Sequence, residues 1–293
     1  MKNGKNIVVV RFDWAIKYIL RNKANFDILE GFLSALLNEA ITILSILESE
    51  SNQEEETDKF NRVDLLVEDS KKRKIIIEIQ NNREIHYMER LLYGTSKVIV
   101  ESINSGSSYK DVTKVLSVSI LYFNFGRGND YIYYGSTKFV GVHNNEPLIV
   151  KERHQNTKVF EPKYEFREKN VFPEYYLIRV GEFENIIRSP IDEWIYMIKN
   201  SEVRDDFQSK NIDKAREKLR IMNMSEEERR KYDKYLVNVA SEEDVVETAR
   251  LEGREEERQN TEKEKERAEK AEKEKEKAEK EKEKAEKEKE KAE

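Results

Sequence analysis

The stretch that decides the fold runs from Arg62 to Gln80 and reads Arg-Val-Asp-Leu-Leu-Val-Glu-Asp-Ser-Lys-Lys-Arg-Lys-Ile-Ile-Ile-Glu-Ile-Gln. Its two ends are runs rich in Val, Ile and Leu that a short charged connection joins, and this pattern predicts a β-hairpin. Alternate residues of a strand face opposite sides, and both sides of both runs are largely apolar. The hairpin is therefore expected to be covered on both faces. Three polar residues interrupt the pattern: Asp64, Glu78 and Gln80.

Asp64 and Glu78 are predicted to lie close together. If Val67 pairs with Ile75, an antiparallel hairpin places the two acids opposite each other, with Cβ atoms roughly 4.5–5.5 Å apart. A register slip of one residue would place them on opposite faces. Two carboxylates about 5 Å apart repel by roughly 3 kcal/mol at an effective dielectric near 20. A shared proton, an Arg or Lys, or a divalent cation would relieve this repulsion, and such oxygen ligands suit Mg²⁺ or Mn²⁺.

Composition limits the class of protein. The 293 residues suffice for one sizeable domain with appendages. Charged residues make up 39% and the net charge is −6, so global charge gives no support for nucleic-acid binding, although a local basic patch and a metal could still hold phosphate. The absence of Cys excludes disulfides and thiol catalysis. With no signal-peptide pattern and no run near 18 apolar residues, we expect a soluble cytoplasmic protein without a membrane segment.

Hydrophobic periodicity and cap residues predict the remaining elements. Asp13 is expected to cap the first helix, and Ser225 with Glu228 matches a capping box for a helix that ends near Ala240. Predicted helices span residues 14–20, 26–37, 84–104, 191–199, 213–222 and 225–240. Predicted strands span residues 41–47, 114–125, 130–140 and 175–180.

The C-terminal tail is of low complexity. Glu and Lys fill the positions between alanines that recur every seven residues, at Ala271, Ala278, Ala285 and Ala292. One alanine per heptad does not make a coiled-coil seam, so the tail is expected to be a solitary charged helix or disordered. We expect three parts: an α/β domain over 1–188, a helical region over 189–250, and the tail over 251–293.

Other chemistries find no motif in this chain. None of the three histidines, His86, His143 and His154, has a second histidine three or four residues away. There is no glycine-rich phosphate loop after a strand, so no nucleotide cofactor is expected, and there is no Gly-x-Ser-x-Gly elbow. The acidic hairpin remains the candidate site.

Asp64, the charged turn and Glu78-Ile79-Gln80 resemble the core motif of the PD-(D/E)XK, restriction-endonuclease-like superfamily. More narrowly, residues 12–240 resemble the Rpn family of recombination-promoting nucleases, often labelled transposases. Arg90, Tyr93 and several segments outside the hairpin carry this resemblance: 12–17, 32–37, 106–109, 192–194 and 224–229. It implies an α/β fold in which helices flank a mixed central sheet, followed by the helical C-terminal region, and it makes 1–188 a nuclease-like domain.

The resemblance also implies a reaction, the Mg²⁺-dependent cutting of DNA, with Mn²⁺ as a substitute ion. Asp64 and Glu78 would ligate the ion, the Ile79 main-chain carbonyl would add a third ligand, and Glu30 would be a further carboxylate near the metal. Gln80 stands where much of the superfamily has Lys. A Gln can orient water or phosphate through hydrogen bonds, but it cannot neutralise charge as Lys does.

Three residues of the helix after the hairpin are candidate DNA contacts. Arg90, Tyr93 and Lys97 are three and four residues apart and form a polar strip on one side of that helix. Arg90 and Tyr93 resemble family positions that could contact phosphate, or that only pack and cap.

Two alternatives to an active DNA endonuclease remain. Gln80 and the acidic charge balance are also compatible with a nuclease fold without turnover that acts as a DNA-binding or protein-interaction module. The C-terminal helices and tail could instead assemble a homo-oligomer. The transposase label would require three separated carboxylates on a ribonuclease-H-like sheet, which cannot be assigned, so we interpret the chain as an endonuclease whose cuts could promote recombination.

Overall fold

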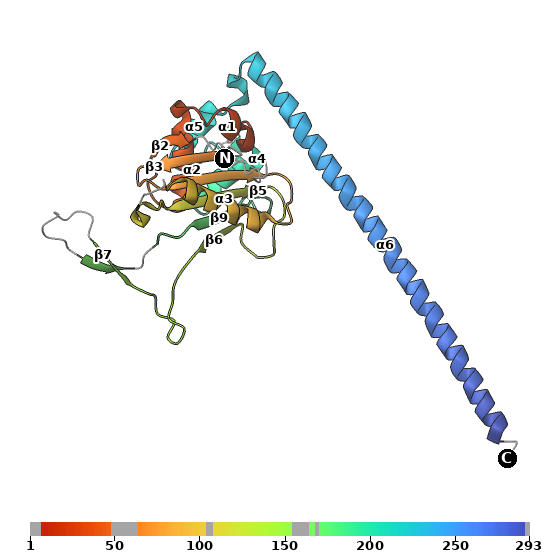
Figure 1. Ribbon diagram of the computed structural model, residues 1–293. Helices are drawn as coiled ribbons and strands as arrows, with labels where there is room; N and C mark the ends of the chain where they lie inside the picture. The colour runs from red at the N-terminus through yellow and green to blue at the C-terminus, as the bar shows by residue number, and fades with distance from the viewer. Residues whose placement is uncertain (1–6, 48–63, 104–107, 154–163, 168–169, 291–293) are drawn as a thin grey trace. The chain divides into compact units, whose positions relative to one another are not determined.

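A six-stranded sheet lies at the centre of the computed structural model, which describes residues 7–47, 64–103, 108–153, 164–167 and 170–290 (Figure 1). Its strand order is β2-β3-β4-β5-β9-β6. The first three strands pair antiparallel, β4, β5 and β9 are parallel, and β6 returns antiparallel to β9. The predicted mixed sheet is thus confirmed. The strands are β2 (Ile43–Leu47), β3 (Leu65–Asp69), β4 (Lys74–Gln80), β5 (Val115–Leu121), β6 (Ile132–Ser136) and β9 (Glu174–Arg179).

Two short antiparallel ladders stand apart from this sheet. One joins β1 (Ile7–Val8) to β10 (Glu202–Val203), and the other joins β7 (Val150–Arg153) to β8 (Tyr164–Arg167). The β1–β10 ladder ties the beginning of the described chain to a segment almost 200 residues later.

Six α-helices complete the described elements: α1 (Phe12–Tyr18), α2 (Phe26–Leu37), α3 (Tyr87–Glu101), α4 (Pro190–Asn200), α5 (Ile212–Lys218) and α6 (Glu226–Glu290). Four 3₁₀ turns lie at Lys23–Asn25, Tyr109–Asp111, Val180–Glu182 and Ile221–Asn223. The predicted cap at Asp13 is wrong, because α1 begins one residue earlier, at Phe12, with Arg11 in the cap position. The buried Asp13 carboxylate instead accepts hydrogen bonds from Arg11 and Asn81.

The turn of the β3–β4 hairpin explains its register. The buried carboxylate of Asp69 accepts hydrogen bonds from the main-chain N–H groups of Lys71 and Arg73, and Lys72 takes a left-handed φ of 63°. Such a side-chain-to-backbone turn holds the loop length, and loop length sets which residues of the two strands pair. Val67 pairs with Ile75, as the sequence analysis assumed.

Helices cover both faces of the sheet. α3 crosses one face, where Val98 packs with Leu66, Ile76 and Val115 (gold in Figure 1). α2 packs against α4 and α5, with the rings of Phe32 and Trp194 6.2 Å apart in an edge arrangement. All of these side chains are buried, so the strands are covered on both sides, as their apolar pattern predicted.

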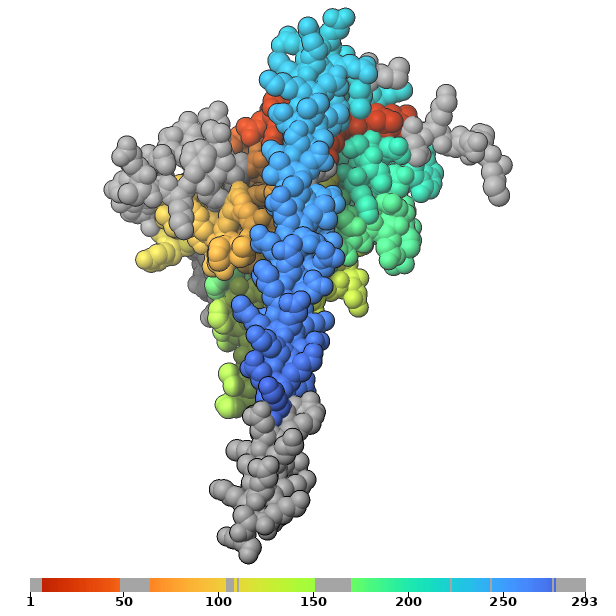
Figure 2. All heavy atoms as spheres, turned by 90° about the vertical axis from the view of Figure 1, so that its right-hand side faces the viewer, coloured from red at the N-terminus to blue at the C-terminus, as the bar shows by residue number. Residues whose placement is uncertain are grey.

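Contacts divide the chain into two compact units, Met1–Tyr232 and Asp233–Glu293. The sheet, α4 and α5 share the first unit, and the expected division into 1–188, 189–250 and 251–293 stays a prediction about domains. The predicted helix end at Ala240 is wrong, because α6 continues from Glu226 to Glu290. The blue spheres of Figure 2 show part of this helix beyond Ala240. The capping box at its start is confirmed: Ser225 and Glu228 exchange hydrogen bonds. Of the two states expected for the tail, α6 adopts the helical one.

Candidate functional site

The candidate site lies where the hairpin's two strands meet at the end away from the turn. β3 begins at Leu65, which pairs with Ile77 in β4. Asp64 is in the bend directly before β3, and Glu78 is the next residue of β4 after Ile77. The antiparallel register therefore brings the two acids to the same end of the hairpin, as predicted. The ladder ends one residue short of the pair, so the Asp64 carboxylate is free to turn toward β4.

The side chain of Asp64 is held by the main chain of the neighbouring strand. Its Oδ2 accepts a hydrogen bond from Ile79 N–H at 2.7 Å, and its own main-chain oxygen accepts one from Arg21 Nη2 at 2.7 Å. In a strand, the N–H and C=O of one residue point to the same side, so the Ile79 carbonyl also faces the Asp64 side of β4. This arrangement brings together Asp64 and Ile79, two of the predicted ligands.

Glu78 is the more buried acid of the pair, with only 4% of its surface exposed. Its Oε1 accepts a hydrogen bond from Arg90 Nη2 at 2.6 Å and another from Gln80 Nε2 at 3.1 Å. Arg90 also pairs through Nη1 with the carboxylate of Glu84. Two of the predicted site residues, Gln80 and Arg90, thus both contact a third, Glu78.

Both acids favour the neutral form more than a free carboxyl does. Burial raises the pKa of Glu78, and the nearby charges of Asp64 and Glu84 raise it further, while Arg90 and Gln80 oppose the shift. Burial also raises the pKa of Asp64 against the Ile79 N–H and the positive charges of Lys17, Arg90 and Arg21. The local cations therefore do not fully compensate the buried negative charge of the pair.

Glu30 makes its hydrogen bond away from the pair. Its Oε1 accepts a hydrogen bond from Ile43 N–H at 2.9 Å, at the beginning of β2. Within the described ranges, no group of three or more Asp, Glu or His side chains could hold a metal ion together. Asp64 and Glu78 therefore stand as a pair of carboxylates rather than as a cluster of three with Glu30.

The polar strip on α3 has three different surroundings. Arg90 points to the acidic pair, as described above. Tyr93 is 40% exposed, and Lys97 lies 3.8 Å from the carboxylate of Glu101 one turn later. Within the described part of the chain, Arg90 is thus the one residue of the three that forms a hydrogen bond with the acidic pair.

Three charged residues near the pair, Lys17, Arg21 and Glu84, were not predicted from the sequence. Glu84 forms an ion pair with Arg90. Lys17, in the last turn of α1, and Arg21, in the turn after α1, interact with Asp64. Glu84 and Arg90 are six residues apart across the start of α3, a spacing without a helical pairing rule. Arg21 and Asp64 are 43 residues apart, so no local pattern joins them.

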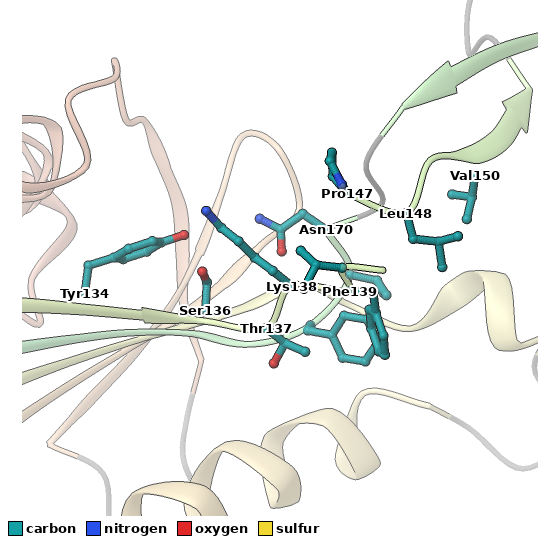
Figure 3. Close-up of a pocket in the computed structure, with 12 residues that line it drawn as sticks. Tyr134, Ser136, Thr137, Lys138, Phe139, Pro147, Leu148, Val150 and Asn170 are labelled. Atoms are coloured by element: carbon teal, nitrogen blue, oxygen red, sulfur yellow. The ribbon is translucent and has the colours of Figure 1, made fainter. Parts of the chain in front are cut away.

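A cavity of about 310 Å³ lies elsewhere, beyond the end of β6 (Figure 3). Its lining is mostly apolar, with Phe139, Leu148 and Phe172 among its walls, and Lys138 as its charged side chain. None of the candidate site residues lines it. The residues that line it include no Asp, Glu or His, so the lining offers no carboxylate or imidazole ligand for a metal ion.

Comparisons with known proteins give one match. Residues 10–249 match the model of a family described as PD-(D/E)XK nuclease family transposase. Neither the comparison with curated proteins nor that with solved structures gives a match. The match spans the sheet, the acidic hairpin, the helices α1 to α5 and about the first third of α6, so the predicted resemblance and the predicted restriction-endonuclease-like α/β fold are confirmed. Among the described helices, none has the length and apolar character needed to cross a membrane.

Proposed function

Because the chain belongs to the PD-(D/E)XK nuclease family transposases, we propose that it is a Mg²⁺-dependent DNA endonuclease that hydrolyses phosphodiester bonds at Asp64 and Glu78. The observation that carries this proposal is the acid pair at the end of the β3–β4 hairpin, in which Glu78 is buried and Asp64 is half-buried. Family membership supports a nuclease, and DNA is the substrate that such a family implies.

The residues at this site fit a divalent cation. Burial disfavours the charge of both carboxylates, and a cation is the partner that would stabilise the ionised forms. The donor set is all oxygen: one carboxylate each from Asp64 and Glu78, and the Ile79 carbonyl on the same side of β4. Mg²⁺ in proteins is commonly held by one or two carboxylates and keeps several waters, so a third carboxylate from Glu30 is not needed. Mn²⁺ would be accepted by the same ligands.

A bound divalent cation would polarise the scissile phosphate and lower the pKa of an attacking water. The protein's own groups orient the rest. The Ile79 N–H holds Asp64 Oδ2 in place, and Gln80 Nε2 with Arg90 holds Glu78 Oε1. The amide of Gln80 can accept or donate one further hydrogen bond to a water or a phosphate oxygen, but it contributes no charge.

Arg90 supplies positive charge beside the pair and is the DNA-contact candidate best placed for a phosphate. A guanidinium carries five N–H donors, and the bonds to Glu78 and Glu84 leave others for phosphate oxygens. Tyr93, one turn farther along α3, is exposed enough to reach a DNA strand. Lys97 would bind phosphate only by exchanging its partner Glu101.

The finer features of the proposal rest on the resemblance to recombination-promoting nucleases. We propose that the cuts promote DNA recombination in the cytoplasm, and that α6 or the preceding helices could assemble copies of the chain. We further propose that the nuclease part corresponds to residues 1–188, with 189–250 and 251–293 as appended parts.

The test is a plasmid-nicking assay with purified protein, Mg²⁺ or Mn²⁺, and an EDTA control. Asp64→Asn and Glu78→Gln should each abolish cutting, because each replaces a charged ligand with a neutral group of the same shape. Glu89→Gln is the matched control, because Glu89 is an exposed carboxylate on α3. Cutting that persists in either site variant would refute the site assignment.

One observation favours a second candidate, a nuclease fold that binds DNA without turnover. Gln80 is neutral where much of the superfamily has Lys, and Arg90 already occupies Oε1 of Glu78. DNA binding that EDTA does not change, with no cutting under any divalent metal, would favour this candidate over the endonuclease.

A further inference from the structure

Two further cations, Lys17 and Arg21, lie near Asp64. They precede the hairpin in the sequence, whereas α3 follows it. α1 buries Phe12, Trp14, Ala15 and Ile16, which leaves Lys17 exposed in its last turn. Arg21 follows four residues later and is also exposed. Because α1 ends at Tyr18, Arg21 lies in the turn after the helix, and the helix and this turn each contribute one exposed cation.

Arg21 contacts the candidate site directly. Its Nη2 donates a hydrogen bond to the main-chain oxygen of Asp64 at 2.7 Å. The bond joins the turn after α1 to the residue directly before β3, 43 positions later. One donor is used, and the remaining N–H groups of the guanidinium stay available to another acceptor.

Lys17 adds charge next to the same residue. Its ammonium group, like the guanidinium groups of Arg90 and Arg21, interacts electrostatically with the Asp64 carboxylate. Across the part of the chain that the structure describes, neither Lys17 nor Arg21 has an ion pair within 4.0 Å. Arg90, by contrast, is paired with two carboxylates.

The acidic groups of the site outnumber the cation that is paired with them. Asp64, Glu78 and Glu84 carry three negative charges when ionised, and Arg90 returns one positive charge. A DNA phosphate brings a further negative charge, and Gln80 cannot offset it. The nearby cations without an acidic partner at ion-pair distance, within the described residues, are Lys17 and Arg21.

We propose that Lys17 and Arg21 form a phosphate-binding edge that holds the DNA backbone beside Asp64, and that Lys17 supplies positive charge that Gln80 lacks. This inference rests on the proposed function and names how the same site binds its substrate. The two residues are binding and positioning groups, because phosphate contacts orient a strand without reading its bases.

The test measures DNA binding without cutting. A fluorescent duplex oligonucleotide is titrated with the full chain in EDTA at several KCl concentrations, and the logarithm of the association constant is plotted against that of the salt concentration. Each lost phosphate contact should lower the slope by about 1 and weaken binding roughly tenfold near 0.1 M salt. We expect this loss in Lys17→Gln and in Arg21→Gln.

Two further variants test whether the positive charge must lie at Lys17 and Arg21 or whether the loss of any nearby lysine weakens binding equally. Lys17→Arg keeps the positive charge and should restore the slope. Lys23→Gln removes an exposed lysine two residues beyond Arg21 and should leave the slope unchanged. Because Arg21 also holds the Asp64 main chain, thermal melting checks its variant. Lys17 makes no hydrogen bond to another described residue, so its variant is the cleaner test.

The outcomes distinguish this inference from the proposed function. Unchanged slopes in both Lys17→Gln and Arg21→Gln overturn it, as does an equal loss in Lys23→Gln or a wild-type chain that does not bind DNA. If the wild type binds with the expected slopes but no divalent metal supports nicking, the endonuclease proposal fails and the phosphate-binding edge stands.

Discussion

Arg90 Nη2 lies 2.6 Å from Oε1 of Glu78, so a cation already occupies one oxygen of a proposed metal ligand. Glu84 gives the same guanidinium a second partner through Nη1. An arginine and a divalent ion repel each other, and the repulsion is strong where water is scarce, as it is around a carboxylate that is 4% exposed. If Glu78 binds a metal ion as proposed, Arg90 would compete with that ion for Glu78, in addition to being a candidate phosphate contact.

Removing Arg90 should separate these two roles. In Arg90→Gln we expect Mn²⁺ to bind several-fold more tightly at pH 8, because a repelling positive charge is lost. Cutting should fall by roughly 10²-fold, the size of effect seen when one stabilising donor of a transition state is removed. Calorimetry with Mn²⁺ and the nicking assay measure the two effects.

Arg83→Gln provides the control for this variant, because Arg83 is an exposed arginine just before α3. It should change neither quantity. Weaker Mn²⁺ binding in Arg90→Gln would contradict the competition, and would mean that Arg90 chiefly keeps Glu78 ionised.

Asp64→Asn should stabilise the fold while it abolishes cutting. Burial raises the pKa of Asp64, which means that the ionised carboxylate is less stable in the folded protein than in the unfolded chain. Near neutral pH this charge therefore destabilises the fold. Asn keeps an oxygen that can accept from Ile79 N–H, and it has no charge to bury. We expect the free energy of unfolding in EDTA at pH 7 to rise by about 0.5–2 kcal/mol, the usual size of such a gain.

The pH dependence of this gain has a definite sign. The wild type recovers stability as the pH falls through the raised pKa of folded Asp64 toward the ordinary value of 3.8, because the folded state then takes up the proton first. The difference between Asp64→Asn and wild type should therefore shrink toward pH 3.8 and vanish below it. Urea unfolding at pH 7 and at lower pH measures this, and a variant less stable at pH 7 would refute it.

Asp27 should show the opposite sign. Burial tends to raise its pKa, but Lys218 and Lys214, 3.0 and 3.2 Å from Oδ2, outweigh burial and hold the pKa below 3.8. This contribution to stability is present above pH 3.8 and is lost as the pH falls through the lowered pKa.

Asp27→Asn should therefore cost about 0.5–1 kcal/mol at pH 7, a small value because solvent screens these partly exposed lysines. Denaturant unfolding should show the difference narrowing below pH 3.8 and in high salt. An equal difference at pH 7 and pH 2 would show that shape rather than charge is responsible.

Gly31→Ala tests the packing of α2 against α4 and α5. An added Cβ would lie 2.4 Å from the main-chain oxygen of Lys210 and 2.6 Å from the Trp194 ring, so the helices would have to move apart. We expect a loss of about 1–3 kcal/mol from this overpacking, although Ala normally favours a helix. Thermal melting of the full chain measures it.

Gly253→Ala is the matched helical control. A Cβ at Gly253, within α6, would meet no atom within 4 Å. The free energy of helix formation in α6 should therefore become more favourable by the ordinary propensity difference between Gly and Ala, roughly 1 kcal/mol. A Gly31→Ala protein as stable as wild type would mean that α2 has more room than the structure gives it.

The β3–β4 hairpin is the part that the sequence by itself determined most completely. Alternating Val, Leu and Ile residues identified its strands, and the pairing of Val67 with Ile75 brought Asp64 and Glu78 to one end. Strand periodicity and a short turn are local properties, so a single sequence carries them. The capping box at Ser225 was predictable for the same reason.

Only the tertiary structure decided which charges surround the acid pair. Arg21 reaches Asp64 across 43 residues, and Glu30 turns to the Ile43 N–H instead of serving as a third carboxylate of the pair. Such contacts depend on how helices dock on the sheet, and docking is set by the summed packing of many side chains rather than by any local pattern. The sequence by itself therefore placed the two carboxylates together, whereas the fold decided which cations stand beside them.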